Sequence, residues 1–227
     1  MGVCCAADIS IQGEDFVVKI IQDPTLKLNE YDYNRLLNLI GSKRIQQELY
    51  KIHIEEFLIP EFYNKDAIDP NTKYLNSIFD YILTQFDEKN NMYAVLLMFY
   101  PFINHTDEII EDTLYTLCQY ISGKLTIMDL ETILYKHITI FTQGLTYAVS
   151  KVCDNQEIIY YLDDLRNNVY TDNNIKNLVN TMLIKMVRST KENHNKIIVT
   201  KEQFKEMLKK YDISSVQSIR SLLMTNY

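Results

Sequence analysis

Apolar residues recur every three or four positions in many consecutive segments of this sequence, and short polar stretches separate the segments. This period is that of an amphipathic α-helix. Only 5 glycines and 4 prolines occur among 227 residues, which disfavours a many-turned β-sandwich. The sequence therefore predicts an all-α fold. The expected helices cover residues 74–86, 107–120, 128–141, 143–152, 155–168, 172–188, 201–211 and 214–224.

The breaks between these helices follow a common order. A helix is followed by a polar or broken segment, then by a short β-prone run, and then by a second helix. Thr126 and Asp129 are residue types that cap the start of a helix, and they stand where the helix over 128–141 is expected to begin. The order occurs four times, and internal repetition of this kind indicates an architecture built from similar units.

Four phrases carry the repeat: KIHIEEFLIPEF from Lys51, FDEKNNMYAVLLMF from Phe86, SGKLTIMDLETIL from Ser122 and KIIVTKEQFKEML from Lys196. In this order they resemble the four EF-hands of the calcineurin B and neuronal calcium sensor group. The resemblance covers about Leu28 to Leu223. It implies a two-lobed, calmodulin-like all-α fold of four degenerate helix-loop-helix hands, with short β-ladders between paired loops.

The resemblance also implies how the chain is divided. Residues 1–15 would be an acylated N-terminal segment, 16–105 the first lobe, and 106–227 the second lobe with an inserted helical stretch around 143–170. Ile52, Leu125 and Val199 would form the ladders. The side chains expected to anchor the exit helices in the core are Phe57, Phe99, Leu130 and Phe204.

Each hand lacks calcium ligands. A calcium loop needs oxygen donors at positions one, three, five and twelve, with a bidentate carboxylate at the last. In the second hand Lys89 takes position three and Met98 position twelve, and in the fourth hand Gln203 replaces the carboxylate. We expect no cofactor and no calcium site of sensor affinity. The weak candidate metal ligands are Asp87, Asn91 and Asp129.

Methionines on the predicted helices suggest a partner site. Flexible methionine side chains line grooves that accept amphipathic helices of varied sequence. The alternative is that they only fill the core. The candidate groove residues are Met98, Met128, Met182, Met186 and Met207.

The chain opens with MGVCCAAD, which resembles a signal for dual acylation. Gly2 would carry myristate, and Cys4 and Cys5 would carry palmitate, because one acyl chain alone anchors a protein only marginally. Ala6 departs from the usual Ser or Thr of the pattern. No apolar run reaches the roughly 20 residues of a spanning helix. The expected location is the cytoplasmic face of a membrane, or the cytosol or cytoskeleton without acylation.

No pattern of catalytic residues is present. The histidines have no paired-ligand spacing, and each is expected to lie at the surface or half-buried. Cys118 and Cys153 have apolar neighbours and are expected to be buried, unreactive thiols. The net charge of -7 disfavours nucleic-acid binding. We therefore expect a protein that is not an enzyme.

These observations predict a membrane-anchored regulatory or adaptor protein that binds an amphipathic helix of a protein partner, largely independently of calcium. Two alternatives stay open. One is a calcium sensor or regulatory subunit, similar to calcineurin B, that retains one site. The other is a structural component of a cytoskeletal or ciliary assembly.

Overall fold

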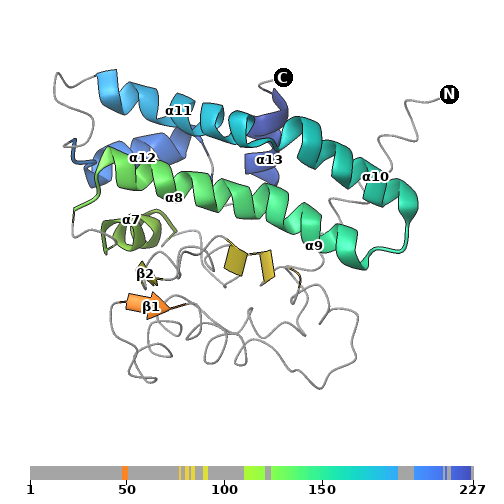
Figure 1. The fold of residues 1–227 in the computed structure, drawn as a ribbon. Coiled ribbons are helices and arrows are strands. Elements are labelled where there is room, and N and C mark those ends of the chain that lie inside the picture. Colours follow the sequence, from red (N-terminus) through yellow and green to blue (C-terminus); the bar gives the residue numbers. More distant parts are fainter. Residues whose placement is uncertain are drawn as a thin grey trace.

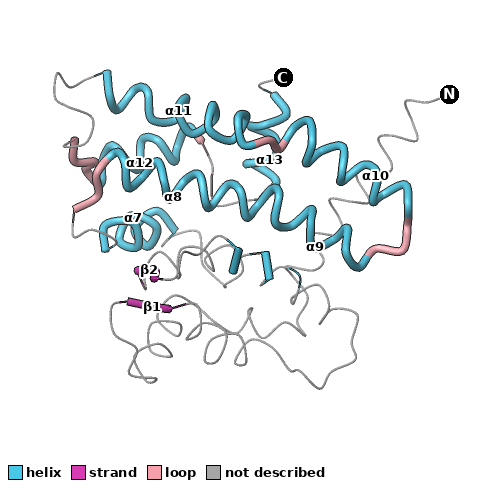
Figure 2. Tube along the Cα trace, in the orientation of Figure 1, coloured by secondary structure: helices cyan, strands magenta, loops and turns pink. Residues whose placement is uncertain are grey.

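The computed structural model describes residues 48–50, 77, 80, 81, 83, 84, 89–91, 110–120, 124–188, 197–211, 213 and 216–225. Helices make up most of this part of the chain (Figures 1 and 2), as an all-α fold requires. Ser77, Asp80, Tyr81, Leu83 and Thr84 are helical, within the predicted helix over 74–86. The predicted acylated segment and most of the predicted first lobe lie outside the described residues.

The described helices follow the predicted ranges closely. The bounds are α7 Ile110–Tyr120, α8 Ile127–Thr139, α9 Leu145–Val152, α10 Gln156–Asp164, α11 Asp172–Arg188, α12 Lys201–Lys210 and α13 Val216–Thr225. Two π-helical turns, η4 Ile140–Gly144 and η5 Leu165–Val169, continue α8 into α9 and extend α10. A π-turn contains one residue more than an α-turn and shifts the side chains that follow it around the axis.

Two long helical runs form the centre of this fold. The first runs through α8, η4 and α9, and the second returns through α10, η5 and α11 (Figure 1). Helix α9 packs against α10, and α8 packs against α11. The stretch around 143–170, expected from the sequence as an inserted element, thus forms α9, α10 and η5, and η4 makes α9 continuous with α8.

Short antiparallel pairings join segments that are distant in the sequence. Thr126 and Ile198 form an isolated bridge between the segment before α8 and the segment before α12. Ile127 N donates to Ile197 O at 3.1 Å, and Val199 N donates to Leu125 O at 2.8 Å. The ladder predicted at Leu125 and Val199 is therefore confirmed.

A second ladder joins β1, Glu48–Tyr50, to β2, Lys89–Asn91. The strands are antiparallel, and Leu49 faces Asn90. Ile52, the residue predicted to form a ladder here, lies outside the described residues.

The described core is mostly apolar and is built from both helical runs together with α7, α12 and α13. Leu130 and Phe204 are completely buried, as predicted for anchors of the exit helices. Phe57 and Phe99, the other predicted anchors, lie outside the described residues. Among the largest fully buried side chains are Tyr170, Phe141 and Phe204.

Helices α8 and α12 both begin with a capping box. The Thr126 hydroxyl accepts from Asp129 N, and the Asp129 carboxylate accepts from Thr126 N. Thr200 and Gln203 make the equivalent pair at α12. Each box satisfies two backbone N–H groups that have no partner inside the helix. The caps predicted at Thr126 and Asp129 are confirmed.

We predict that Thr126→Ala lowers the free energy of unfolding by about 1 kcal/mol, because it removes the cap of α8. Urea denaturation followed by far-UV circular dichroism measures this change. Thr132→Ala is the matched control, since Thr132 is exposed within the same helix and its hydroxyl donates only to Met128 O. The control should change stability by less than about 0.5 kcal/mol. Equal losses in the two variants would contradict the assignment of the cap.

Candidate functional site

Asp129 and Gln203, the residues expected at the last ligand position of two degenerate calcium loops, lie in the first turns of α8 and α12. Asp129 Oδ2 accepts from Thr126 Oγ1 at 2.6 Å and from Thr126 N at 3.2 Å. Gln203 Oε1 accepts from Thr200 N at 3.0 Å. Both side chains thus bond to the residue that caps their own helix. The loops are held by hydrogen bonds within the protein.

One other candidate ligand, Asn91, lies in the described part of the chain. Asn91 lies in β2, and Asp87 lies outside the described residues. No group of three or more His, Cys, Asp or Glu residues placed to hold a metal occurs among the described residues.

The five methionines of the predicted groove do not form one exposed surface. Met182 in α11 and Met207 in α12 are buried, whereas Met128 at the start of α8 is 48% exposed. Met98 and the side chain of Met186 lie outside the described part. In the structure, Met182 and Met207 contribute to the core.

Three exposed apolar side chains lie toward the end of the fold where the loops pair. Ile198, opposite Thr126 in the bridge, is 50% exposed, and Ile184 near the end of α11 is 45% exposed. Because α11 packs against α8 and runs back along it, the end of α11 lies near the start of α8 (Figure 1). We call Met128, Ile184 and Ile198 the loop-end surface.

A polar cluster joins three segments near η4, and we call Tyr81, Gln143, Tyr170 and Asp172 the Gln143 junction. The Tyr81 hydroxyl donates to Gln143 Oε1 at 2.9 Å. Gln143 Nε2 donates to Tyr170 O at 2.6 Å and to Asp172 Oδ1 at 3.1 Å. One carboxamide therefore connects the helical segment around Tyr81 with the start of α11.

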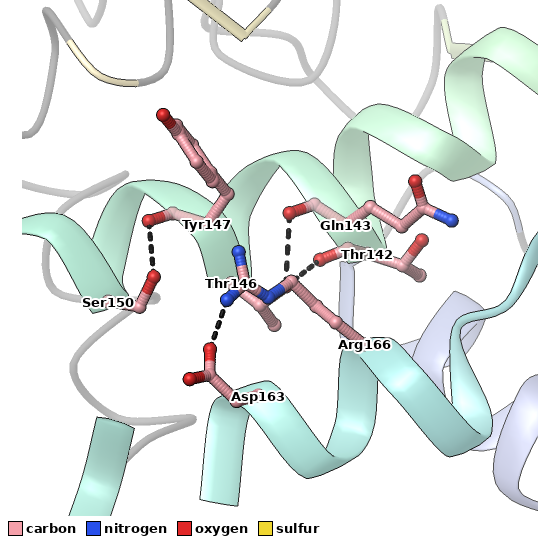
Figure 3. A network of polar contacts seen from close by, with 7 residues as sticks. All are labelled: Thr142, Gln143, Thr146, Tyr147, Ser150, Asp163 and Arg166. Carbon is pink, nitrogen blue, oxygen red and sulfur yellow. Dashed lines mark hydrogen bonds and ion pairs between the residues drawn. The ribbon is translucent and has the colours of Figure 1, made fainter. Parts of the chain in front are cut away.

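Threonine hydroxyls stabilise the π-turn that carries Gln143. Thr142 Oγ1 donates to Ile138 O at 2.7 Å. Thr146 Oγ1 donates to Thr142 O at 2.7 Å and to Gln143 O at 3.0 Å (Figure 3). Thr142 and Thr146 are fully buried. These bonds satisfy carbonyl oxygens where the regular helical pattern is interrupted, which keeps η4 stable inside the core.

The surroundings of the junction raise the pKa of two phenols near Asp172. Burial, and next the negative charge of Asp172, raise the pKa of Tyr81 to about 12. Burial followed by Asp172 also raises the pKa of Tyr135. At neutral pH the Tyr81 hydroxyl therefore acts as a neutral hydrogen-bond donor to Gln143.

A cationic contact lies next to the junction, on the ring of Tyr147. Lys151 Nζ lies 5.0 Å from the ring centroid, and the Arg166 guanidinium carbon lies 5.7 Å from it. Arg166 also pairs with Asp163 (Figure 3), while the Tyr81 and Tyr147 rings lie 5.7 Å apart. The aromatic rings and these charges together tie α9 to α10 and η5.

Two burial predictions for cysteine and histidine are wrong. Cys118 is buried, and burial raises the pKa of its thiol to about 12, but Cys153 is only half-buried because it lies at the end of α9 with extended backbone. His137 is buried rather than at the surface. Its Nε2 lies 2.8 Å from Ile213 O, and its ring lies 4.5 Å from that of Phe141. His137 therefore connects α8 to the segment before α13.

No sequence pattern singles out Gln143 or Tyr81, although Gly144 is a signal of a close contact in this region. A glycine inside a helical pattern often marks a close approach. A Cβ at Gly144 would lie 2.7 Å from Tyr81 Cδ1. Its φ of -63° is helical, so lack of space rather than backbone conformation requires glycine.

Comparisons with known proteins add no assignment to this geometry. No protein-family model matches the sequence, and searches of curated proteins and of solved structures also give no match. Within the described residues, no helix combines the length and apolar character needed to cross a membrane.

We predict that Gly144→Ala lowers the free energy of unfolding by about 1–3 kcal/mol, since the new methyl group forces the Tyr81 ring to move. In a Tyr81→Ala background the same change should raise stability by about 0.5–1 kcal/mol, because alanine then keeps only its helix-propensity advantage over glycine. Urea denaturation of the four proteins measures this coupling. Equal effects of Gly144→Ala in both backgrounds would contradict the contact.

Proposed function

We propose that this protein is a non-catalytic regulatory or adaptor protein of degenerate EF-hand type, anchored to a membrane by its N-terminus. It binds an amphipathic helix of a protein partner without requiring calcium. The observation that carries the proposal is the pair of helix-loop-helix units, α7 with α8 and α11 with α12, whose loops are joined at Thr126 and Ile198.

Calcium independence is supported by the hydrogen bonds of the loops. In a calcium loop the carboxylate at position twelve binds the ion with both oxygens. At the corresponding place Asp129 bonds to Thr126, and Gln203, which has no charge, bonds to Thr200. Thus no ion is needed to define the start of either exit helix. The arrangement favours constitutive binding over a calcium-driven switch.

The loop-end surface is the proposed place for the partner. The buried state of Met182 and Met207 argues against a partner contacting them in this conformation. Met128, Ile184 and Ile198 offer exposed apolar side chains at one end of the fold. An amphipathic helix recognises such a surface with apolar residues spaced three or four apart.

Membrane attachment rests on Gly2, Cys4 and Cys5, which lie outside the described residues. One acyl chain gives marginal binding and two or three give stable binding. The resemblance to calcineurin B supports a regulatory or scaffolding subunit of a phosphatase, kinase, transporter or cytoskeletal assembly.

We predict that the protein, expressed in cells with its native N-terminus, sediments with membranes and is released by detergent. Gly2→Ala combined with Cys4→Ser and Cys5→Ser should leave it in the supernatant, because the acyl chains are lost. Fractionation by ultracentrifugation measures both. Sedimentation of the two proteins despite detergent would contradict membrane anchoring and favour the structural cytoskeletal alternative.

We also predict that the complex with the partner, purified from those membranes, keeps its mass after calcium is chelated with EGTA. Met128→Lys together with Ile198→Lys should release the partner, because lysine places a charge in the apolar contact. Asn180→Lys, at an exposed position of α11, is the matched control and should retain it. Native mass spectrometry compares the masses. Dissociation by EGTA alone would favour the calcium-sensor alternative.

A further inference from the structure

Arg220 is a charged residue inside the fold. It lies in α13, which packs against η4 and α11, and only 2% of its surface is exposed. Its neighbour in sequence, Ile219, and Leu223 on the following turn are also buried. The guanidinium carbon lies 5.8 Å from the centroid of the Tyr170 ring. The Arg220 side chain thus contacts an aromatic ring and belongs to an apolar helix face.

One edge of this guanidinium has no acceptor. Nε and Nη2 of Arg220 are buried and make no hydrogen bond in the described structure. No carboxylate among the described residues forms an ion pair with Arg220. Nε and Nη2 share one side of the planar group, and their N–H bonds point in parallel. This edge is the one that binds a carboxylate through two hydrogen bonds.

A buried guanidinium without an acceptor is unfavourable, and arginine cannot relieve the cost by losing its proton. An anion with two oxygens in one plane would satisfy both N–H groups and neutralise the charge. Only 2% of the surface of Arg220 is exposed, so a macromolecular partner cannot reach it. A small anion can enter when α13, the last described helix, opens locally.

We propose that Arg220 is the receptor for a small free carboxylate, which binds side-on to Nε and Nη2 next to the Tyr170 ring. The apolar residues of α13 favour a ligand with a short hydrocarbon body. This site is separate from the loop-end surface, and the proposal does not depend on the proposed function.

The test uses the full chain labelled with ¹⁵N-arginine and observes the Nε–Hε signals by NMR. Sodium acetate and sodium propionate are titrated against sodium chloride at constant ionic strength. The Arg220 signal should shift in a saturable way, and its hydrogen exchange should slow severalfold. Arg166, already paired with Asp163, is the internal control and should not shift. An unchanged Arg220 signal, or a larger shift with inorganic phosphate than with either carboxylate, would overturn the proposal.

Arg220→Met provides a second measurement and identifies the signal by its loss. In chloride buffer this variant should melt at a higher temperature than the natural protein, because it buries no unpaired charge. The difference in melting temperature should shrink as propionate is added. A melting temperature that rises equally in both proteins would show a general salt effect and would overturn the proposal.

Discussion

The bridge between Thr126 and Ile198 is the contact on which the arrangement of the described helices depends. It lies directly before α8 and α12, so the hydrogen bonds from Ile127 to Ile197 and from Val199 to Leu125 position the starts of both helices together. The ion pairs of Asp112 with Lys201 and Lys205 add a weaker connection between α7 and α12, since all three side chains are partly exposed. Once the starts of α8 and α12 are placed, α11, which precedes α12 in the chain, can pack along α8.

The π-turns then determine which side chains the following part of each long helical run directs toward its neighbours. At η4 the turn combines buried apolar residues with Gln143, whose carboxamide reaches both Tyr81 and Tyr170. Gly144 leaves the space in which the Tyr81 ring packs. The same region contacts α13, the helix that carries Arg220. The Gln143 junction and the proposed carboxylate site are therefore adjacent parts of the fold, connected through Tyr170, which belongs to the first and contacts the second.

The sequence predicts the features of the fold that depend on interactions between residues close together in the chain. The period of apolar residues predicts α8, α11 and α12 closely, and the caps Thr126 and Asp129 mark the start of α8. The Gln143 junction could not be predicted this way, because Tyr81 and Gln143 are 62 residues apart. Burial of His137 and Arg220 could not be predicted either, because polar residues usually indicate exposure and both side chains contact segments that are distant in the sequence.

Helix capping and ion binding at these loops would compete for the same side-chain oxygen atoms. A cation bound by Asp129 would draw the carboxylate away from Thr126, and the start of α8 would lose a cap worth about 1 kcal/mol. A loop with several carboxylates repays such a loss through the strength of the ion contacts, but Gln203 brings no charge to the paired loop. The two capping boxes therefore stabilise the observed conformation of the helix starts without an ion, and under the proposed function a partner at the loop-end surface would meet this same conformation with or without calcium.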